Sequence, residues 1–247
     1  MQLWQPNDGY RYNTDSILLY DFAARKRLRG SILDVGCGCG IVGLLLARDF
    51  NLSLTGVDIQ EEMVRFAEKN SAQNGIKARF AACDFRGFDE SFSESFNGGF
   101  NDGFSEGFNG GKKFDSIVSN PPFYSAKTTP SKNGSLRLAR YADALSIDDF
   151  LRGAGRLLAS DGDLFFCYDA AESSALISLM NSLKWHIKAI RFAHRDRASS
   201  ARLMFIHAKK SSVKSCEILA PIFMRENGAI SAEIAEIGKR AATQCAN

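Results

Sequence analysis

A short aliphatic strand that runs directly into a glycine-rich loop constrains the fold of this chain more than any other stretch. Residues 31–35 read Ser-Ile-Leu-Asp-Val, residues 36–40 read Gly-Cys-Gly-Cys-Gly, and residues 41–49 have the composition of a helix. Glycines let the backbone approach a ligand closely, and the N-terminus of a helix directs free N–H groups at it. A strand, a glycine loop and a helix in this order predict an α/β fold with a ligand at the carboxyl end of the strand.

Two further predicted strands end in acidic residues that would share this edge of the sheet. Residues 53–57 lead to Asp58, which lies 18 residues beyond Gly40, and an acid at that point can accept both hydroxyls of a ribose. Residues 78–83 lead to Asp84, which can accept from an adenine amino group or can cap a helix or turn.

The glycine loop alone does not identify its ligand, because Gly38, Gly40 and Gly43 also satisfy the dinucleotide fingerprint. Asp34, two residues before the first glycine, separates the alternatives. A loop that binds pyrophosphate would rarely have a carboxylate so close, whereas the ammonium group of an amino-acid cofactor would favour one. The loop therefore favours S-adenosylmethionine over NAD.

The fourth predicted strand, residues 114–118, stops at Asn120-Pro121-Pro122-Phe123. Each proline fixes φ and lacks an N–H, so the carbonyls of Asn120 and Pro121 can face a cavity instead of entering a ladder. The Asn120 side chain adds another acceptor, and Phe123 offers a flat apolar face. This set suits a planar molecule with an amino group, such as a nucleobase, and a strand that ends in a rigid turn is the structural alternative.

Composition indicates one folded domain. The 247 residues are 45% apolar and 24% charged, as in ordinary soluble proteins, and the longest aliphatic run, residues 41–47, is far too short to span a bilayer. No signal segment is evident at the N-terminus, so we expect a cytoplasmic protein with no membrane partner. The six cysteines form no Cys-x-x-Cys pair and lack histidines at zinc-ligand spacing, which predicts reduced thiols and no metal.

Residues 86–111 are a low-complexity insertion of Phe, Gly, Ser, Asn and acidic residues. Phenylalanine recurs there at every fourth position, but each of the six glycines from Gly98 to Gly111 costs roughly 1 kcal/mol against a helix, so we expect a disordered loop. The insertion has a net charge of −4, and the rest of the chain therefore carries +7. A basic body allows a polyanionic partner.

Basic residues gather in two other places. The segment 124–142 contains four Lys or Arg and no acid, and residues 184–214 contain nine Lys or Arg and one acid. Phosphate contacts explain such one-sided charge next to a base pocket, and a solvated surface is the alternative. The residues predicted to contact RNA are Lys127, Lys132, Arg137, Arg140, Arg195 and Arg197. Residues 10–16, which include Thr14 and Asp15, suit either a helix cap or a lid over a small ligand.

The four strand ends together resemble the class I S-adenosylmethionine-dependent methyltransferases. The Asn-Pro-Pro-aromatic turn is similar to that of the members that methylate amino groups: adenine N6, guanine N2 or a glutamine side chain. More of the chain resembles the bacterial tRNA (adenine-N6) methyltransferases that modify the adenine beside the anticodon of a valine tRNA. This resemblance covers residues 9–19, 32–84, 114–123 and 137–141, and it extends to residues 218–221 and 226–228.

The resemblance implies a Rossmann-like fold with a mostly parallel seven-stranded sheet and helices on both faces, in a single domain over residues 1–247. It implies S-adenosylmethionine as cofactor and tRNA as substrate. The implied cofactor-binding residues are Thr14, Asp15, Asp34, Gly36, Gly38, Gly40, Asp58, Ile59, Asp84 and Phe85. The implied catalytic residues are Asn120, Pro121, Pro122 and Phe123: Asn120 Oδ1 and the Pro121 carbonyl accept from the target amine, and Phe123 stacks on the base.

Other functions keep part of this pattern. An rRNA guanine-N2 methyltransferase or a protein glutamine-N5 methyltransferase would share the turn, but the protein methyltransferase gives no reason for the basic residues after it. An NAD-dependent oxidoreductase would use the glycine loop and leave Asn120 unexplained. A non-catalytic RNA-binding module would bind tRNA without S-adenosylmethionine.

Overall fold

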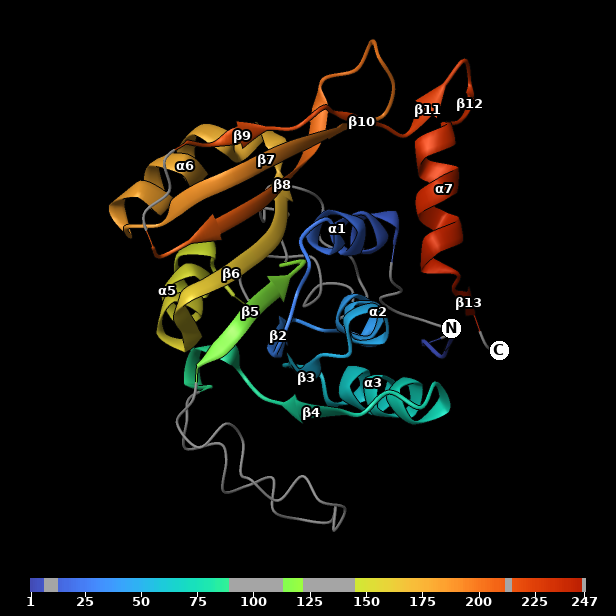
Figure 1. Cartoon of the computed structure of the whole chain (residues 1–247), viewed down its shortest axis with the longest axis vertical. Helices are drawn as coiled ribbons and strands as arrows, with labels where there is room; N and C mark the ends of the chain where they lie inside the picture. Colours follow the sequence, from blue (N-terminus) through green and yellow to red (C-terminus); the bar gives the residue numbers. More distant parts are fainter. Residues whose placement is uncertain (7–12, 89–112, 122–144, 212–214, 246–247) are drawn as a thin grey trace, which may run out of the picture.

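The computed structural model describes residues 1–6, 13–88, 113–121, 145–211 and 215–245, and its centre is one mixed β-sheet (Figure 1). Within these residues the sheet has nine strands. The two pairs that β8 makes, with β6 and with β7, are antiparallel, and all the other pairs in the sheet are parallel. In spatial order they are β10 (Ile222–Phe223), β7 (His186–His194), β8 (Ala201–Lys209), β6 (Leu158–Asp169), β5 (Phe114–Ser119), β2 (Ser31–Val35), β3 (Ser53–Asp58) and β4 (Ala78–Ala82), with β9 (Glu217–Ile218) also on β7. This Rossmann-like arrangement confirms the predicted fold class.

The prediction of seven strands was two short. The additional strands, β9 and β10, have two residues each and both pair with β7. Pro221 lies between them and has no N–H to give to a ladder, so this segment follows β7 in two short pieces. The seven longer strands of the described sheet correspond to the seven expected.

Helices cover both faces of the sheet and enclose two apolar cores (Figure 1). Alternate residues of a strand point to opposite faces, so Ile32 lies in one core while Leu33 and Val35 lie in the other. The first core is closed by α1 (Thr14–Ala24), α2 (Ile41–Phe50), α3 (Glu61–Gln73) and α7 (Ala232–Ala241), and the second by α5 (Ile147–Leu157) and α6 (Ser173–Ser182).

Helix α1 starts one residue earlier than predicted. Thr14 or Asp15 was the cap in one of the two interpretations of this segment, but the N-cap is Asn13, whose Oδ1 accepts from the Ser16 N–H at 3.3 Å. Asparagine is among the strongest N-cap residues, so either neighbour was a reasonable choice from the sequence alone. The cap position matters because it places Asp15 and Ser16 inside the first turn.

The predicted insertion begins later than residue 86. Residues Phe85–Gly87 form a 3-10 turn, η1, and Phe88 is fully buried in the core beneath α5. The first phenylalanine of the repeat is therefore a core residue. Residues 89–112, to which the prediction of disorder refers, lie outside the described residues.

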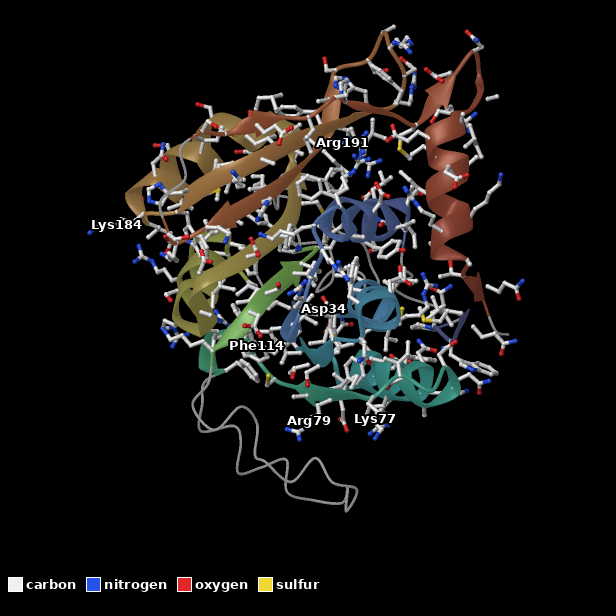
Figure 2. The ribbon with its side chains drawn as sticks, viewed as in Figure 1. Asp34, Lys77, Arg79, Phe114, Lys184 and Arg191 are labelled. Carbon is white, nitrogen blue, oxygen red and sulfur yellow. The ribbon has the colours of Figure 1, made fainter. Side chains whose placement is uncertain are left out.

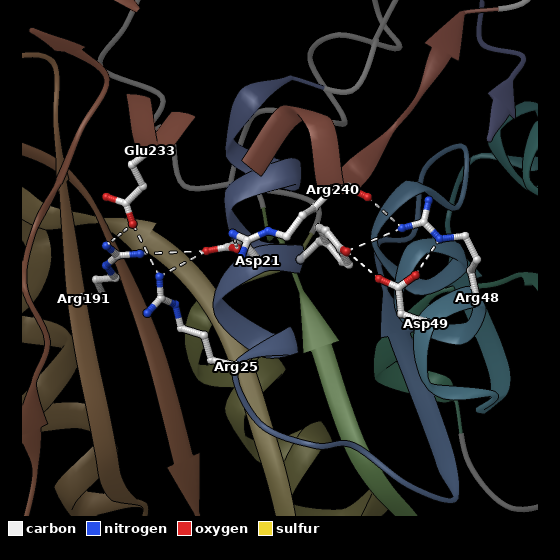
Figure 3. Close-up of polar contacts among 8 residues, drawn as sticks. Asp21, Arg25, Arg48, Asp49, Arg191, Glu233 and Arg240 are labelled. Atoms are coloured by element: carbon white, nitrogen blue, oxygen red, sulfur yellow. Dashed lines mark hydrogen bonds and ion pairs between the residues drawn. The ribbon is translucent and has the colours of Figure 1, made fainter. Parts of the chain in front are cut away.

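The C-terminal part of the chain returns to α1. After β11 (Arg225–Glu226) and β12 (Ala229–Ile230), α7 packs against α1, and β13 (Gln244–Cys245) pairs in parallel with β1 (Gln2–Leu3). A charged network joins α7 to α1 and β7 (Figure 3). Arg191, only 4% exposed, pairs with Glu233 at 2.6 Å and lies 3.9 Å from the buried Asp21, which also pairs with Arg25 and Arg240.

Replacing Arg191 should cost more stability than replacing an exposed arginine. In Arg191→Met the carboxylate of Asp21 stays buried with one cation fewer, and we expect a loss of about 3 kcal/mol in the free energy of unfolding. Arg65→Met is the matched control, because Arg65 pairs with Glu61 and both side chains are about 70% exposed. The control should change by less than about 1 kcal/mol in urea unfolding. Equal losses of unfolding free energy in the two variants would show that Arg191 in the buried network contributes no more stability than an exposed arginine.

Candidate active site

The structure brings four predicted site elements to one edge of the sheet. Strands β4, β3, β2 and β5 are adjacent and parallel, so their carboxyl ends lie side by side. The four strands lie in this order in Figure 1. Asp84, the glycine loop 36–40 and Asn120 follow β4, β2 and β5, and Asp58 is the last residue of β3. A ligand that spans this edge can reach all four.

The glycine loop needs its glycines for two different reasons. Gly36, Gly38 and Gly40 have φ of 66°, 54° and 83°, which L side chains rarely adopt. A Cβ on Gly36 would meet nothing within 4 Å, so the start of the loop faces open space that a ligand can enter. A Cβ on Gly40 would lie 3.2 Å from Ala67, so this glycine also lets α2 pack against α3.

Asp58 fixes the loop from the neighbouring strand. Its Oδ2 accepts from the Gly38 N–H at 2.8 Å, its Oδ1 accepts from the Gln60 N–H at 2.9 Å, and burial raises its pKa. The next residue, Ile59, is 45% exposed, which is unusual for a large aliphatic side chain. An acceptor and an exposed apolar surface thus stand next to each other, as a nucleoside would require.

Asp34 is buried between β2 and α2 (Figure 2). Its Oδ2 accepts from the Gly43 N–H at 2.9 Å, and a Cβ on Gly43 would lie 2.9 Å from that same oxygen, so glycine is required there. Burial, together with the charge of Asp58, raises the pKa of Asp34 to about 7 although the Gly43 hydrogen bond opposes the shift. Such a carboxyl group would lose its proton readily beside a cationic ligand.

At Asp84 the structure shows the cap that was one of two predicted roles. Its Oδ1 accepts from the Arg86 N–H at 2.9 Å, and the hydrogen bond from the Arg86 side chain lowers its pKa. The ring of Phe85 is 5% exposed and packs on Phe150 with centroids 6.1 Å apart. The ring of Phe85 therefore belongs to the core, and any cofactor contact of this residue would involve its backbone.

The carboxamide of Asn120 is held at both ends. Its Nδ2 donates to Ser16 Oγ at 3.2 Å, and the thiol of Cys167 donates to its Oδ1 at 2.9 Å. One residue earlier, Ser119 Oγ donates to the Val35 carbonyl at 2.8 Å, directly before the glycine loop. Pro121 is buried, whereas Pro122 and Phe123 lie outside the described residues.

The first turn of α1 faces this amide. Asp15 is 6% exposed, pairs with Arg202 at 3.1 Å and accepts from Asn13 Nδ2 at 3.2 Å. Burial raises the pKa of Asp15, and the cation of Arg202 opposes that shift. Thr14 is exposed at the start of the helix. The structure thus gives Asp15 protein partners and leaves Thr14 open to solvent.

Asn70 was not predicted and supports the loop from behind. It is fully buried in α3, and its Nδ2 donates at 2.9 Å to the carbonyls of both Cys39 and Trp4, while its Oδ1 accepts from the Trp4 N–H. The side chain thereby ties the N-terminal segment to the glycine loop. Its helical spacing from the buried Ala67 is the feature that could have revealed it.

Two of the six predicted RNA contacts can be located. Arg195 and Arg197 lie after β7, and their side chains are 77% and 73% exposed. Each pairs with an acid, Asp196 or Glu226, and Arg197 lies 4.7 Å from the centroid of the Phe223 ring. The other four, Lys127, Lys132, Arg137 and Arg140, lie outside the described residues. In the part of the chain that the structure describes, no group of His, Cys, Asp and Glu could hold a metal ion.

Known proteins share this architecture. The profile of a methyltransferase domain matches residues 29–212. A tRNA1(Val) (adenine(37)-N6)-methyltransferase of Parabacteroides distasonis is 30% identical over 179 residues, which cover 72% of this chain and 67% of that protein.

Solved structures agree at the level of the fold. A predicted O-methyltransferase, protein Atu636 from Agrobacterium tumefaciens, superposes with a TM-score of 0.64 at 19% identity and covers 94% of this chain and 99% of its own. The 16S rRNA N2 G1207 methyltransferase of T. thermophilus, in complex with AdoMet and guanosine, gives a TM-score of 0.53 at 21% identity over 81% of this chain and 44% of its own.

The fold and the glycine-loop site together define an S-adenosylmethionine-dependent methyltransferase. The chain belongs to the methyltransferase domain family and, within it, to the family of the tRNA1(Val) (adenine(37)-N6)-methyltransferases, which confirms the resemblance seen in the sequence. The site also fits this cofactor on structural grounds, because open space at Gly36, a carboxylate at Asp58 and an exposed Ile59 lie along one edge.

Asp34→Asn should reduce the pH dependence of stability of the ligand-free protein. With a pKa of about 7 in the folded state against an ordinary 3.8, Asp34 keeps a proton that the unfolded chain has released. Its contribution is therefore present below pH 4 and is lost as the pH rises towards 7. Asparagine keeps an acceptor for Gly43 and has no proton to lose. Urea unfolding at pH 5 and pH 8 measures the difference.

The matched control is Glu68→Gln on the exposed side of α3. It removes one carboxylate from the surface. The decrease in the free energy of unfolding from pH 5 to pH 8 should therefore be the same in this variant as in the wild type. A fall of unchanged size in Asp34→Asn would show that Asp34 is ionised in the folded protein throughout this range.

Proposed function

We propose that this protein transfers the methyl group of S-adenosylmethionine to the exocyclic N6 of an adenine in tRNA, beside the anticodon of a valine tRNA. The observation that carries the proposal is the position of Asn120, one strand away from the glycine loop, with its carboxamide oriented by two buried side chains. The names of the relatives, tRNA1(Val) (adenine(37)-N6)-methyltransferase, support the same substrate.

Asn120 and Pro121 would act on the target amine as hydrogen-bond acceptors. The lone pair of an aromatic amine is delocalised into the ring, so the amine is a poor nucleophile until acceptors draw its N–H groups out of the plane. Asn120 Oδ1 and the Pro121 carbonyl are acceptors of this kind, and no strong base is needed. S-adenosylmethionine supplies an electrophilic methyl group when bound. Alignment of two reactants can lower a barrier by roughly 7–11 kcal/mol.

The residues at the sheet edge would divide the cofactor among them. Asp34 and the loop 36–40 would hold the methionine part, Asp58 the ribose, and Ile59 and Asp84 the adenine. Asp34 suits the ammonium group because burial has raised its pKa, and a nearby cation would favour the carboxylate form. Thr14 and Asp15 would approach from α1.

The tRNA would lie across the same edge. Arg195 and Arg197 follow β7, whose carboxyl end lies at this edge because β7, like β6, is antiparallel to β8. With Lys127, Lys132, Arg137 and Arg140 they would contact phosphates, which set the position of the RNA rather than its sequence. The target base must leave its stack to reach Asn120, and the single-stranded anticodon loop makes this step inexpensive.

None of the described helices combines the length and the apolar composition that a membrane span requires. The cytoplasmic location stays a prediction.

Asn120→Ala should abolish methyl transfer and leave cofactor binding in place. Labelled S-adenosylmethionine is incubated with unmodified tRNA, the methylated nucleoside is identified by mass spectrometry, and cofactor affinity is measured by calorimetry. We expect N6-methyladenosine from the wild type and none from the variant. Asn181→Ala, an exposed asparagine on α6, is the control and should be fully active.

Each other outcome of this experiment has a definite meaning. If Asn120→Ala keeps most of its activity, the catalytic role is wrong. If the wild type produces N2-methylguanosine, or methylates a protein release factor and not tRNA, the target amine is wrong while the turn keeps its role. Binding of tRNA without methyl transfer by the wild type would support the non-catalytic module.

Asp58→Ala should weaken the binding of S-adenosylmethionine by about 10- to 100-fold, since hydrogen bonds to a charged group contribute about 1.5–3 kcal/mol. Asp169→Ala is the matched control: Asp169 ends β6 and accepts from the Ala171 N–H in the way that Asp58 accepts from Gln60. Calorimetry should show near wild-type affinity for the control. Unchanged affinity in Asp58→Ala would count against the ribose assignment.

A further inference from the structure

We propose that Ser16 and Cys167 set the orientation of the Asn120 carboxamide, so that its oxygen, and not its NH₂ group, faces the target amine. They are positioning residues, because they act on the substrate only through Asn120. The inference rests on the proposed function, since it assumes that Asn120 is the acceptor for the amine.

A carboxamide has two ends of nearly equal size and opposite hydrogen-bonding character. Rotation of the Asn120 side chain by 180° would exchange Oδ1 for Nδ2 and would present donors to an amine that itself donates. The amine would then lose an acceptor and face a donor instead. A turn that depends on Asn120 as an acceptor therefore needs neighbours that distinguish the two ends.

The structure provides one neighbour for each end. Ser16 Oγ, on α1, accepts from Nδ2 at 3.2 Å, and the thiol of Cys167, on β6, donates to Oδ1 at 2.9 Å. Ser16 is 3% exposed and Cys167 is 0% exposed, so neither contact is open to exchange with water. The Ser16 backbone is itself fixed by the Asn13 cap.

Cys167 is the neighbour that discriminates. A serine hydroxyl can donate or accept, so Ser16 alone would tolerate either end of the amide. A reversed amide would turn its N–H groups towards the sulfur, which is only a weak acceptor, and would leave the buried S–H without its Oδ1 partner. Burial also raises the pKa of Cys167 well above its ordinary value, so the sulfur keeps the proton that it donates.

The same contact leaves Oδ1 available. A carbonyl oxygen has two lone pairs, and the thiol uses one of them, so the second remains for the target amine. Because S–H is a weak donor, it takes little of the acceptor strength of Oδ1. A buried thiol can therefore fix the amide without occupying the position that the proposed chemistry needs.

The test compares kcat with binding in four variants. Cys167→Ala and Ser16→Ala should each lower kcat by about 3- to 10-fold, as expected for one neutral hydrogen bond, with the KM for tRNA and the Kd for S-adenosylmethionine unchanged. Cys167→Ser keeps a donor at the same place and should restore kcat to within about 2-fold of wild type. Ile206→Val, which shortens a buried side chain on β8, is the control for loose packing and should keep its kcat.

A second background separates orientation from structure. In Asn120→Asp both ends of the side chain are oxygens, so the residue presents an acceptor whichever way it turns. Adding Cys167→Ala to Asn120→Asp should then change kcat by less than about 2-fold, whereas a general structural defect would lower it as much as in the Asn120 protein.

Defined results would overturn the inference. These are a wild-type kcat in both alanine variants, a loss that Cys167→Ser does not restore, or an equal loss in the Asn120→Asp background. If Asn120→Asp has no measurable activity, the kcat values of Cys167→Ala and Cys167→Ser in the Asn120 protein are sufficient to accept or reject the inference. Failure of the proposed function is recognised separately: Asn120→Ala would stay active, or the wild type would form a different methylated product or none.

Discussion

The site depends on the parallel pairing of β2 with β5. Val35 and Ser119 are partners in that register, and Ser119 Oγ donates to the Val35 carbonyl at 2.8 Å. The glycine loop begins one residue after Val35, and Asn120 follows Ser119. The distance between the proposed cofactor loop and the proposed acceptor is therefore set by sheet geometry rather than by flexible side chains. A shift of register by one residue would separate the two and turn their side chains to the other faces.

Two buried acids, Asp34 and Asp58, hold the glycine loop at the end of β2, and a nearby cation would change their ionisation. Asp34 and Asp58 each accept backbone N–H groups, which partly offsets the cost of burying charge, yet desolvation still raises the pKa of both. Without ligand, both carboxyl groups therefore keep their protons to a higher pH than exposed carboxyl groups do. A cofactor with an ammonium group and a sulfonium would favour the ionised forms, so in the proposed function the two acids contribute to both architecture and binding.

The sequence predicted the parts of the site that local patterns encode. Strand β2 and the four strand ends follow from apolar runs that stop at glycines, acids or prolines. The contacts of Ser16 and Cys167 with Asn120 could not be predicted, because they join residues 104 and 47 positions apart. The burial of Phe88 was missed for another reason: the uniform phenylalanine repeat hides the one member that belongs to the core. Only the packing of η1 against α5 distinguishes it.

Helix α1 connects the rest of the fold to the site through its polar residues. It is buried on most sides, so each polar side chain within it needs a partner from another element. Asp15 pairs with Arg202, and Ser16 accepts from Asn120. Asp21 lies near Arg191 and pairs with Arg25, directly after α1, and with Arg240 of α7. Apolar contacts alone would allow the helix to slide or rotate slightly at little cost, whereas paired charges and hydrogen bonds do not. The C-terminal helix therefore helps to hold α1, the helix that carries Ser16, through the pair of Arg240 with Asp21.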